Sequence, residues 1–160
     1  MTQPGTTAAR ITAEVHMEVP FFDVDSLNIV WHGNYCKYFE ITRCELLHKI
    51  GYDYTVMRET GYAFPIVELK AKYILPLVFQ QRVRIRAELS EWEHRLKCEY
   101  EISDAQSGVV HTRGTSIQAA VALGDQHLQL VCPAVFTERV EHYLSALSAR
   151  RDGSPLTEIT

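Results

Sequence analysis

Hydrophobic and polar residues alternate along much of the chain, the pattern of strands that have one buried face. The first alternating segment runs from Ile11 to Phe22. The others cover Pro65 to Tyr73, Arg82 to Leu89, residues 95–103 and about His111 to Leu123. We therefore expect an antiparallel sheet of about five strands. In the last strand, the alternation favours Thr115, Ile117 and Ala119 on one face, and the small residues on the other face could allow it to be covered too.

One segment departs from this alternation. From Asn34 to Ile50 the spacing is helical, and apolar residues cover well over half of the circumference, so this helix is expected to be buried on most sides. Asn34 suits the N-cap, and Gly51 lies where a left-handed C-cap residue is wanted. A sheet with a single apolar face needs a partner, and a sheet wrapped around this helix is the simplest arrangement.

The pattern after Pro133 predicts a second helix from about Ala134 to Ala149. The chain is thus expected to have an α+β fold in which the sheet surrounds a long central helix and a C-terminal helix follows. We expect a single domain over residues 10–149, a disordered tail over 1–9 and a flexible tail over 150–160.

Composition limits the classes of function. The net charge of -4 gives no general attraction to nucleic acid or anionic lipid. No apolar run approaches the roughly 20 residues of a membrane-spanning helix, and the polar N-terminus lacks a signal-peptide core. The four cysteines show no CxxC pair and no metal-ligand spacing. We expect a cytoplasmic protein with reduced core cysteines, no nucleic-acid partner and no metal.

The candidate chemistry lies between the first strand and the long helix. Asp23 and Asp25 follow the strand, and His32, Gly33 and Asn34 precede the helix. Free N–H groups and a positive dipole end coincide at a helix start. An acid and a histidine at this position indicate a candidate chemical site.

Structural roles explain the same residues when each is taken alone. Aspartate favours turns and caps, and a single histidine is more often a hydrogen-bonded structural residue than a catalytic one. A calcium loop is disfavoured, because Leu27 occupies the third alternating ligand position. It is the conjunction of Asp25 and His32 with the helix start that favours a functional site.

These residues form a pattern that resembles the hotdog-fold acyl-CoA thioesterases of the 4-hydroxybenzoyl-CoA thioesterase type, a group that includes the thioesterases associated with the Tol-Pal system. The pattern comprises Asp23-Val24-Asp25, Ile29-Val30, His32, Asn34-Tyr35 and Tyr38-Phe39-Glu40, with a weaker match at Tyr73-Ile74-Leu75-Pro76-Leu77. The family often has glycine three residues after the second Asp. Asn28 stands there in this chain and tolerates a positive φ better than most residues.

The resemblance implies hydrolysis of an acyl-CoA thioester, with Asp25 as nucleophile or as general base. It implies that His32 positions or polarises the thioester, and the backbone amides of His32, Gly33 and Asn34 are candidate donors to the carbonyl oxygen. No cofactor is implied, because coenzyme A is part of the substrate. Residues expected to line the acyl pocket are Tyr35, Phe39, Phe64 and Tyr73. Family members are usually homodimers or homotetramers, with sites between subunits.

Several alternatives stay open at this stage. The acyl group could arrive on an acyl carrier protein, or the domain could bind acyl-CoA without catalysis; a hydratase is disfavoured because its paired His and acid are not seen. Glu40 is expected to pair with Arg43 or Lys37, or to line the pocket. Asp23 is expected to be structural and Glu68 exposed. The row Arg82, Arg84 and Arg86 could receive CoA phosphates, but a solvated face explains it equally well.

Overall fold

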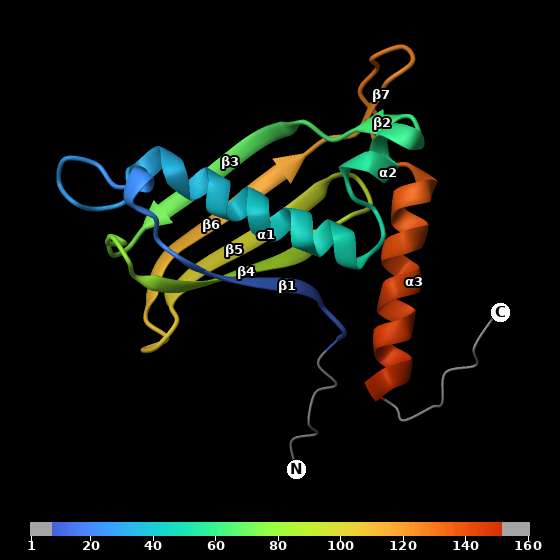
Figure 1. The fold of residues 1–160 in the computed structure, drawn as a ribbon. Coiled ribbons are helices and arrows are strands. Elements are labelled where there is room, and N and C mark those ends of the chain that lie inside the picture. The colour runs from blue at the N-terminus through green and yellow to red at the C-terminus, as the bar shows by residue number, and fades with distance from the viewer. Residues whose placement is uncertain (1–7, 152–160) are drawn as a thin grey trace.

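The computed structural model describes residues 8–151, so most of both predicted tails lies outside the described residues. Its centre is a five-stranded antiparallel sheet in the spatial order β1-β4-β5-β6-β3 (Figure 1). The strands of this sheet are β1 (Ile11–Glu18), β4 (Arg82–Glu91), β5 (Leu96–Asp104), β6 (Val110–Gln118) and β3 (Ile66–Tyr73). A separate short pair joins β2 (Tyr62–Ala63) to β7 (Val121–Ala122).

Within residues 8–151, three α-helices complete the domain. They are α1 (Tyr35–Lys49), α2 (Tyr54–Glu59) and α3 (Ala134–Arg151). Helix α1 lies along one face of the sheet, and α3 stands across one end of it (Figure 1). The predicted fold, a sheet around a long helix followed by a C-terminal helix, is confirmed. Helix α3 continues two residues beyond the predicted end, and this is within the usual uncertainty of helix boundaries.

The position of α1 depends on one glycine in the sheet. The ring of Phe39 stacks on Tyr100 of β5, with the ring centroids 4.5 Å apart. A Cβ atom at Gly114 of β6 would lie 2.5 Å from the Phe39 ring, closer than atoms can approach. Gly114 therefore allows the helix to rest directly on the centre of the sheet.

One face of α1 remains exposed, although the sequence predicted burial on most sides. Ile41 keeps 45% of its surface exposed, and Lys37, Glu45 and His48 are also exposed. Cys36 and Cys44 are half-buried and not in the core, whereas Cys98 and Cys132 are buried. All four thiols are free. The sheet is a single layer, so it packs against only one side of the helix.

The buried residues of β6 come from both faces of the strand, and three of them are polar. Thr112, Ser116 and Gln118 are buried, and Ser116 reaches the residues of α1. Ile117 was expected to mark the core face; it is buried too, but it alternates with these residues. The hydrophobic pattern did not identify the buried residues of this strand, because its inner face is polar. The apolar residues that follow belong to a turn and to β7.

Strand β3 forms an open edge of the sheet. It pairs with β6 on one side, and no strand of the described residues pairs with its other side. Large apolar side chains along it are exposed, including Ile66 at 42% and Val67 at 60%. An exposed apolar edge strand can pair with a strand of another chain.

Candidate active site

The loop before α1 is held in one tight shape. Its backbone closes through hydrogen bonds from Asp25 N to Ile29 O and from Asn28 N to Asp25 O, both 2.9 Å. Asn28 adopts a φ of 62°. The prediction that Asn28 takes the left-handed conformation normally given to glycine is therefore confirmed.

Asp25 lies half-buried on this loop. Its Oδ1 accepts a hydrogen bond from Leu27 N at 2.8 Å. Within residues 8–151, Oδ2 forms no hydrogen bond. One oxygen thus fixes the side chain, and the other is available to a substrate or a water molecule. The bond to Leu27 is also what a simple turn residue would make, so geometry alone leaves both roles open.

Asp23 connects the loop to the helix. Its side chain is only 2% exposed; Oδ2 accepts a hydrogen bond from Tyr38 Oη at 2.8 Å, and Oδ1 pairs with Lys37. Its carbonyl oxygen accepts bonds from Trp31 N at 3.0 Å and Asn34 Nδ2 at 2.8 Å. Burial, aided by Asp23, raises the pKa of Tyr38, so its hydroxyl remains a donor. Asp23 therefore holds the acidic loop against the start of α1.

A short 3-10 helix, η2 (His32–Asn34), leads into α1. Asn34 does not cap the helix with its side chain, which is engaged with Asp23 instead. The N–H of Asn34 donates to Trp31 O at 2.9 Å. Asn34 is thereby removed from the three amides that the sequence suggested for the carbonyl, because its proton is already engaged. His32 and Gly33 lie at the first positions of η2, where amides have no acceptor within the helix.

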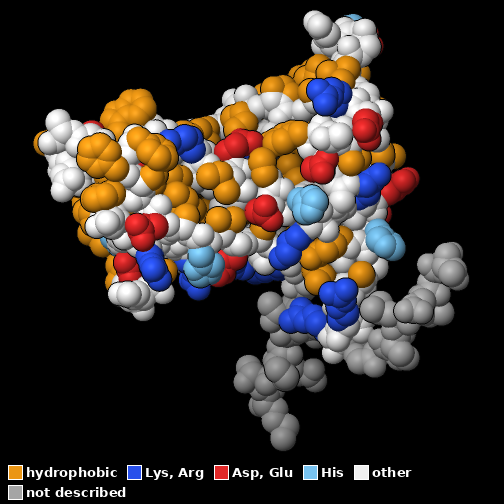
Figure 2. All heavy atoms as spheres, viewed as in Figure 1, with side chains coloured by type: hydrophobic (Ala, Val, Ile, Leu, Met, Phe, Trp, Pro, Cys, Tyr) orange, Lys and Arg blue, Asp and Glu red, His pale blue; other side chains and the backbone are white. Residues whose placement is uncertain are grey.

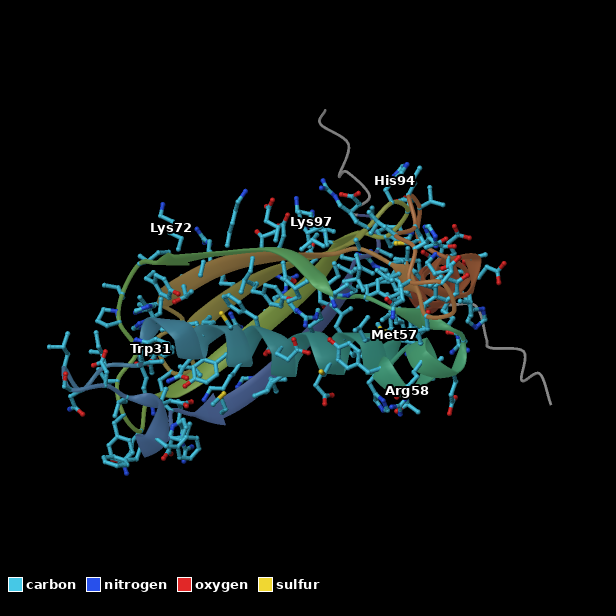
Figure 3. All side chains as sticks on the ribbon, turned by 90° about the horizontal axis from the view of Figure 1, so that it is seen from above. Trp31, Met57, Arg58, Lys72, His94 and Lys97 are labelled. Carbon is cyan, nitrogen blue, oxygen red and sulfur yellow. The ribbon has the colours of Figure 1, made fainter. Side chains whose placement is uncertain are left out.

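Gly33 lies directly against Trp31. A Cβ atom there would overlap the ring of Trp31, so that ring would have to shift. Trp31 lies at the start of α1 (Figure 3), and its ring centroid is 4.8 Å from that of His32. His32 itself is exposed, and no hydrogen bond joins it to Asp25 among residues 8–151. The carbonyl of His32 accepts a hydrogen bond from Tyr73 Oη at 2.8 Å.

Three of the four residues expected to line an acyl pocket lie in the core. Tyr35, Phe39 and Phe64 are 2%, 0% and 4% exposed, whereas Tyr73 is 47% exposed. Phe64 packs against Phe136 of α3, with the ring centroids 5.3 Å apart. Aromatic residues of a core and of a pocket look alike in a sequence, and here core packing accounts for these three.

Hydrophobic side chains gather over the end of the molecule where the loop before α1 lies (Figure 2). This apolar tip combines exposed residues of two loops, which are Phe21, Phe22, Leu27, Trp31, Val78 and Phe79. Phe21 and Phe79 meet edge to face, with their ring centroids 5.8 Å apart. The apolar tip surrounds the loop that carries Asp25. Asp25 therefore lies beside a surface that suits an apolar partner.

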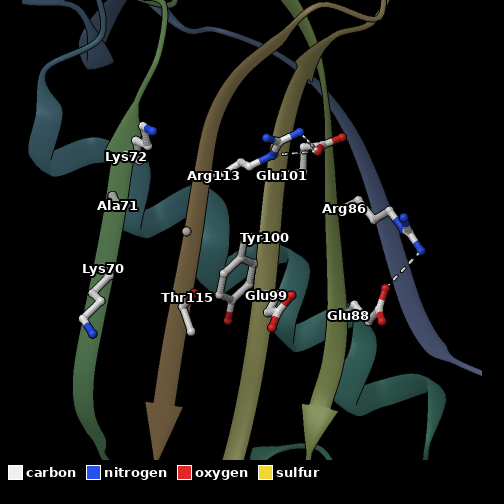
Figure 4. Close-up of a pocket in the computed structure, with 11 residues that line it drawn as sticks. Lys70, Ala71, Lys72, Arg86, Glu88, Glu99, Tyr100, Glu101, Arg113 and Thr115 are labelled. Atoms are coloured by element: carbon white, nitrogen blue, oxygen red, sulfur yellow. Dashed lines mark hydrogen bonds and ion pairs between the residues drawn. The ribbon is translucent and has the colours of Figure 1, made fainter.

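The far face of the sheet offers a different kind of surface. Lys72 and Lys97 point away from α1 (Figure 3). A hollow of about 520 Å³ on that face is lined by charged residues of β3, β4, β5 and β6 (Figure 4). Several of its charges are paired, with Arg113 to Glu101 at 3.1 Å and Arg86 to Glu88 at 3.2 Å. Mutual pairing on a solvated face accounts for this hollow, as it does for Glu68, which pairs with Lys70 at 3.0 Å.

One buried polar cluster was not foreseen. Arg43 of α1 is 2% exposed. It pairs with Glu40 and donates to Tyr100 Oη at 3.3 Å, to Ser116 Oγ at 3.4 Å and to Tyr54 Oη at 3.1 Å. The sequence suggested the Glu40–Arg43 pair but not that the arginine is buried beneath the sheet. The signal available was a charged pair within an otherwise apolar helix.

No helix formed by residues 8–151 is long and apolar enough to cross a membrane. Within the same residues, no cluster of three or more His, Cys, Asp or Glu side chains is arranged to hold a metal ion.

Comparison with known proteins places these features in a family. Residues 19–147 match the model of the thioesterase-like superfamily. Among curated proteins, one named "Putative esterase" from Aquifex aeolicus is 33% identical over 73 residues, 46% of this chain and 57% of that protein. "Putative acyl-CoA thioesterase YneP" from Bacillus subtilis is 26% identical over 76 residues, 48% of this chain and 55% of that protein. The chain thus spans a little over half the length of these relatives.

A solved structure extends the likeness to nearly the whole domain. The DHNA-CoA thioesterase from Staphylococcus aureus superimposes with a TM-score of 0.74 at 21% identity, covering 93% of this chain and 99% of that one. This agreement confirms the predicted hotdog fold. Since the family match over residues 19–147 covers the acidic loop, α1 and every strand of the sheet except β1, the chain belongs to the thioesterase-like superfamily.

Proposed function

We propose that this protein hydrolyses an acyl-CoA thioester to a free acid and coenzyme A. The observation that carries the proposal is the position of Asp25. One of its oxygens is fixed by Leu27 N and the other forms no hydrogen bond within residues 8–151, on a loop that Asp23 holds against the start of α1. Membership of the thioesterase-like superfamily supports the same reaction.

The chemistry needs an anionic oxygen and donors to the carbonyl. Asp25 either attacks the carbonyl carbon, giving an anhydride that water then opens, or removes a proton from the attacking water. In both routes the C–S bond breaks and the sulfur leaves as a thiolate, which needs no strong acid because a thiol has a pKa of about 8.5. The amides of His32 and Gly33 are the donors that we assign to the carbonyl oxygen. His32 also helps to position the thioester.

Within the family we assign the chain to the 4-hydroxybenzoyl-CoA and Tol-Pal-associated type. The support is the sequence pattern from Asp23 to Glu40, which has the acid in the loop before the helix.

We infer that the active form is a homodimer or a larger even-numbered assembly. The apolar edge of β3 ends beside the apolar tip, so a second copy paired along β3 would cover both surfaces and lie next to Asp25. Light scattering on the purified protein tests this point, and a monomer at micromolar concentration would contradict it.

The test of the reaction is thiol release from short, long and aromatic acyl-CoAs by the wild type and by Asp25→Asn. Asparagine can keep the bond to Leu27 and removes only the charge. We expect a loss of about a hundredfold or more, the scale of a missing catalytic group. The matched control is Asp125→Asn, because Asp125 Oδ1 accepts a similar bond from His127 N at 3.0 Å in an exposed turn. That control should retain full activity.

Equal activity of Asp25→Asn and the wild type would contradict the assignment of Asp25. If no acyl-CoA is cleaved, the same assay with acyl carrier protein substrates tests the second carrier. If acyl-CoA binds but neither kind of thioester is cleaved, the protein is a binding domain and not an enzyme.

A further inference from the structure

Tyr73 connects the open edge of the sheet to the start of α1. It is the last residue of β3, and its hydroxyl donates to His32 O at 2.8 Å across 41 positions of sequence. Its ring packs edge-on against Tyr35, with the centroids 4.9 Å apart and an interplanar angle of 77°. The direction of the hydroxyl is therefore set by packing as well as by the hydrogen bond.

The carbonyl that Tyr73 holds belongs to the same peptide group as the N–H of Gly33. A trans peptide group is planar, so its C=O and N–H point in opposite directions, and no cis bond occurs among residues 8–151. Fixing the carbonyl of His32 therefore fixes the direction of the Gly33 N–H. Tyr73 is the only side chain within residues 8–151 that forms a hydrogen bond to this peptide group, which lies in η2.

We propose that Tyr73 is a positioning residue whose hydroxyl aims the Gly33 amide at the carbonyl oxygen of the substrate. This inference rests on the proposed function. It gives Tyr73 a role in the reaction step, whereas its sequence context suggested contact with the acyl group. Burial, with a smaller contribution from Cys36, raises the pKa of Tyr73. The hydroxyl thus keeps the proton that it donates.

Preorganised donors matter because they need no reorientation when charge develops on the oxygen. Loss of a whole donor costs on the order of a hundredfold to a thousandfold in kcat, and a misdirected donor should cost less. For Tyr73→Phe, which keeps the ring and removes only the hydroxyl, we expect kcat to fall about tenfold with KM nearly unchanged. Single-turnover rates measured with saturating enzyme should fall by the same factor. The control is Tyr143→Phe on α3, which should leave kcat and KM unchanged.

A spectroscopic readout separates positioning from stability. In an Asp25→Asn background, which prevents turnover, the infrared band of a bound ¹³C-carbonyl acyl-CoA reports the hydrogen bonding of the thioester carbonyl. Adding Tyr73→Phe should move that band back toward its position in free solution. This measurement is made on folded, substrate-bound protein, so it does not depend on the yield of the variant.

Each other outcome would overturn the proposal. An increase in KM with kcat unchanged would make Tyr73 a pocket residue. If kcat is unchanged and the carbonyl band does not shift, Tyr73 has only a structural role. A wild type that cleaves no thioester would remove the proposed function and this inference together, whereas an active wild type and a fully active Tyr73→Phe would remove this inference alone.

Discussion

The inner face of the sheet has two halves of different character. Under β1, β4 and β5 the buried residues are almost all apolar, and they include Ile11, Val83, Ile85, Leu89, Leu96 and Ile102. On the inner face of β6, next to the open edge, they are Thr112, Ser116 and Gln118, and Arg43 of α1 donates a hydrogen bond to Ser116. The same helix thus rests on a hydrophobic core on one side and on a hydrogen-bonded network on the other.

The polar half is only partly satisfied, because the buried Thr112 Oγ1 and Gln118 Oε1 have no hydrogen-bond partner within residues 8–151. Tyr100 and Ser116 share a hydrogen bond of 2.7 Å beneath Arg43. Burial opposes the charge of Arg43, but Tyr100, Tyr54 and Glu40 together raise the pKa of its guanidinium, so the charge persists. A buried charge of this kind contributes little net stability, because desolvation offsets the attraction. The comparison indicates that the apolar half holds the fold together, whereas the polar half orders side chains near the edge.

The largest effect on stability should come from the apolar half. Ile85 is fully buried at the centre of β4. Ile85→Ala should lower the free energy of unfolding by about 3 kcal/mol, through lost burial and the cavity left behind. Urea denaturation measures this value. A loss under about 1 kcal/mol would show that the two halves do not differ as described.

A smaller effect, with a distinct pH dependence, is expected at Cys98 of β5. Burial raises the pKa of its thiol from 9.0 to about 12. Below pH 9 both the folded and the unfolded chain keep the proton, so the contribution to stability is fully present. As the pH rises from 9 to 12, only the unfolded chain ionises readily, and stability falls.

Cys98→Ala should cost about 1 kcal/mol at pH 7, similar to deleting one buried methyl group. It should also lose stability less steeply than the wild type above pH 9, because the titrating group is gone. Chemical denaturation at pH 8, 9 and 10 gives the two slopes. Identical slopes would contradict the burial of an un-ionised thiol.

The smallest change in stability is expected in the polar half. Arg43→Met should alter the free energy of unfolding by less than about 1 kcal/mol, because Glu40 keeps 43% of its side chain exposed and can be hydrated when left alone. Methionine also fills much of the space. The same denaturation assay measures it, and a loss as large as that of Ile85→Ala would make the network part of the main stabilising core.

The sequence predicted most of the fold because alternation is a strong local signal. It located five strands, α1 and the C-terminal helix, and Asn28 takes the positive φ that its residue type tolerates, but the first strand ends at Glu18 and not at Phe22, and the last at Gln118 and not at Leu123. On β6 it did not single out the polar residues of the core, since a strand that buries Thr112, Ser116 and Gln118 gives no hydrophobic pattern to follow. Ser116 contacts Arg43, which lies 73 positions earlier in the sequence, so no local pattern indicates that contact.

The site was predictable in part for similar reasons. Asp25 and His32 were found from a compact motif, but their catalytic roles stay predictions. The contacts of Asp23 with Tyr38 and of Tyr73 with His32 join distant segments, so no local pattern indicates them. The choice among the three candidate amides also needed the structure, because only the fold shows that Asn34 N already bonds to Trp31 O.

Gly114 has a consequence beyond core packing. Phe39 rests on it five residues after Asn34, which at 1.5 Å per residue is about 8 Å along the axis of α1. A methyl group at position 114 would push Phe39 away from the sheet, and a helix is stiff enough to carry that displacement to its first turn. Errors of about 1 Å in the alignment of reacting groups can cost on the order of a hundredfold in rate. The absence of a side chain at Gly114 thereby determines how accurately the amides of His32 and Gly33 are aligned.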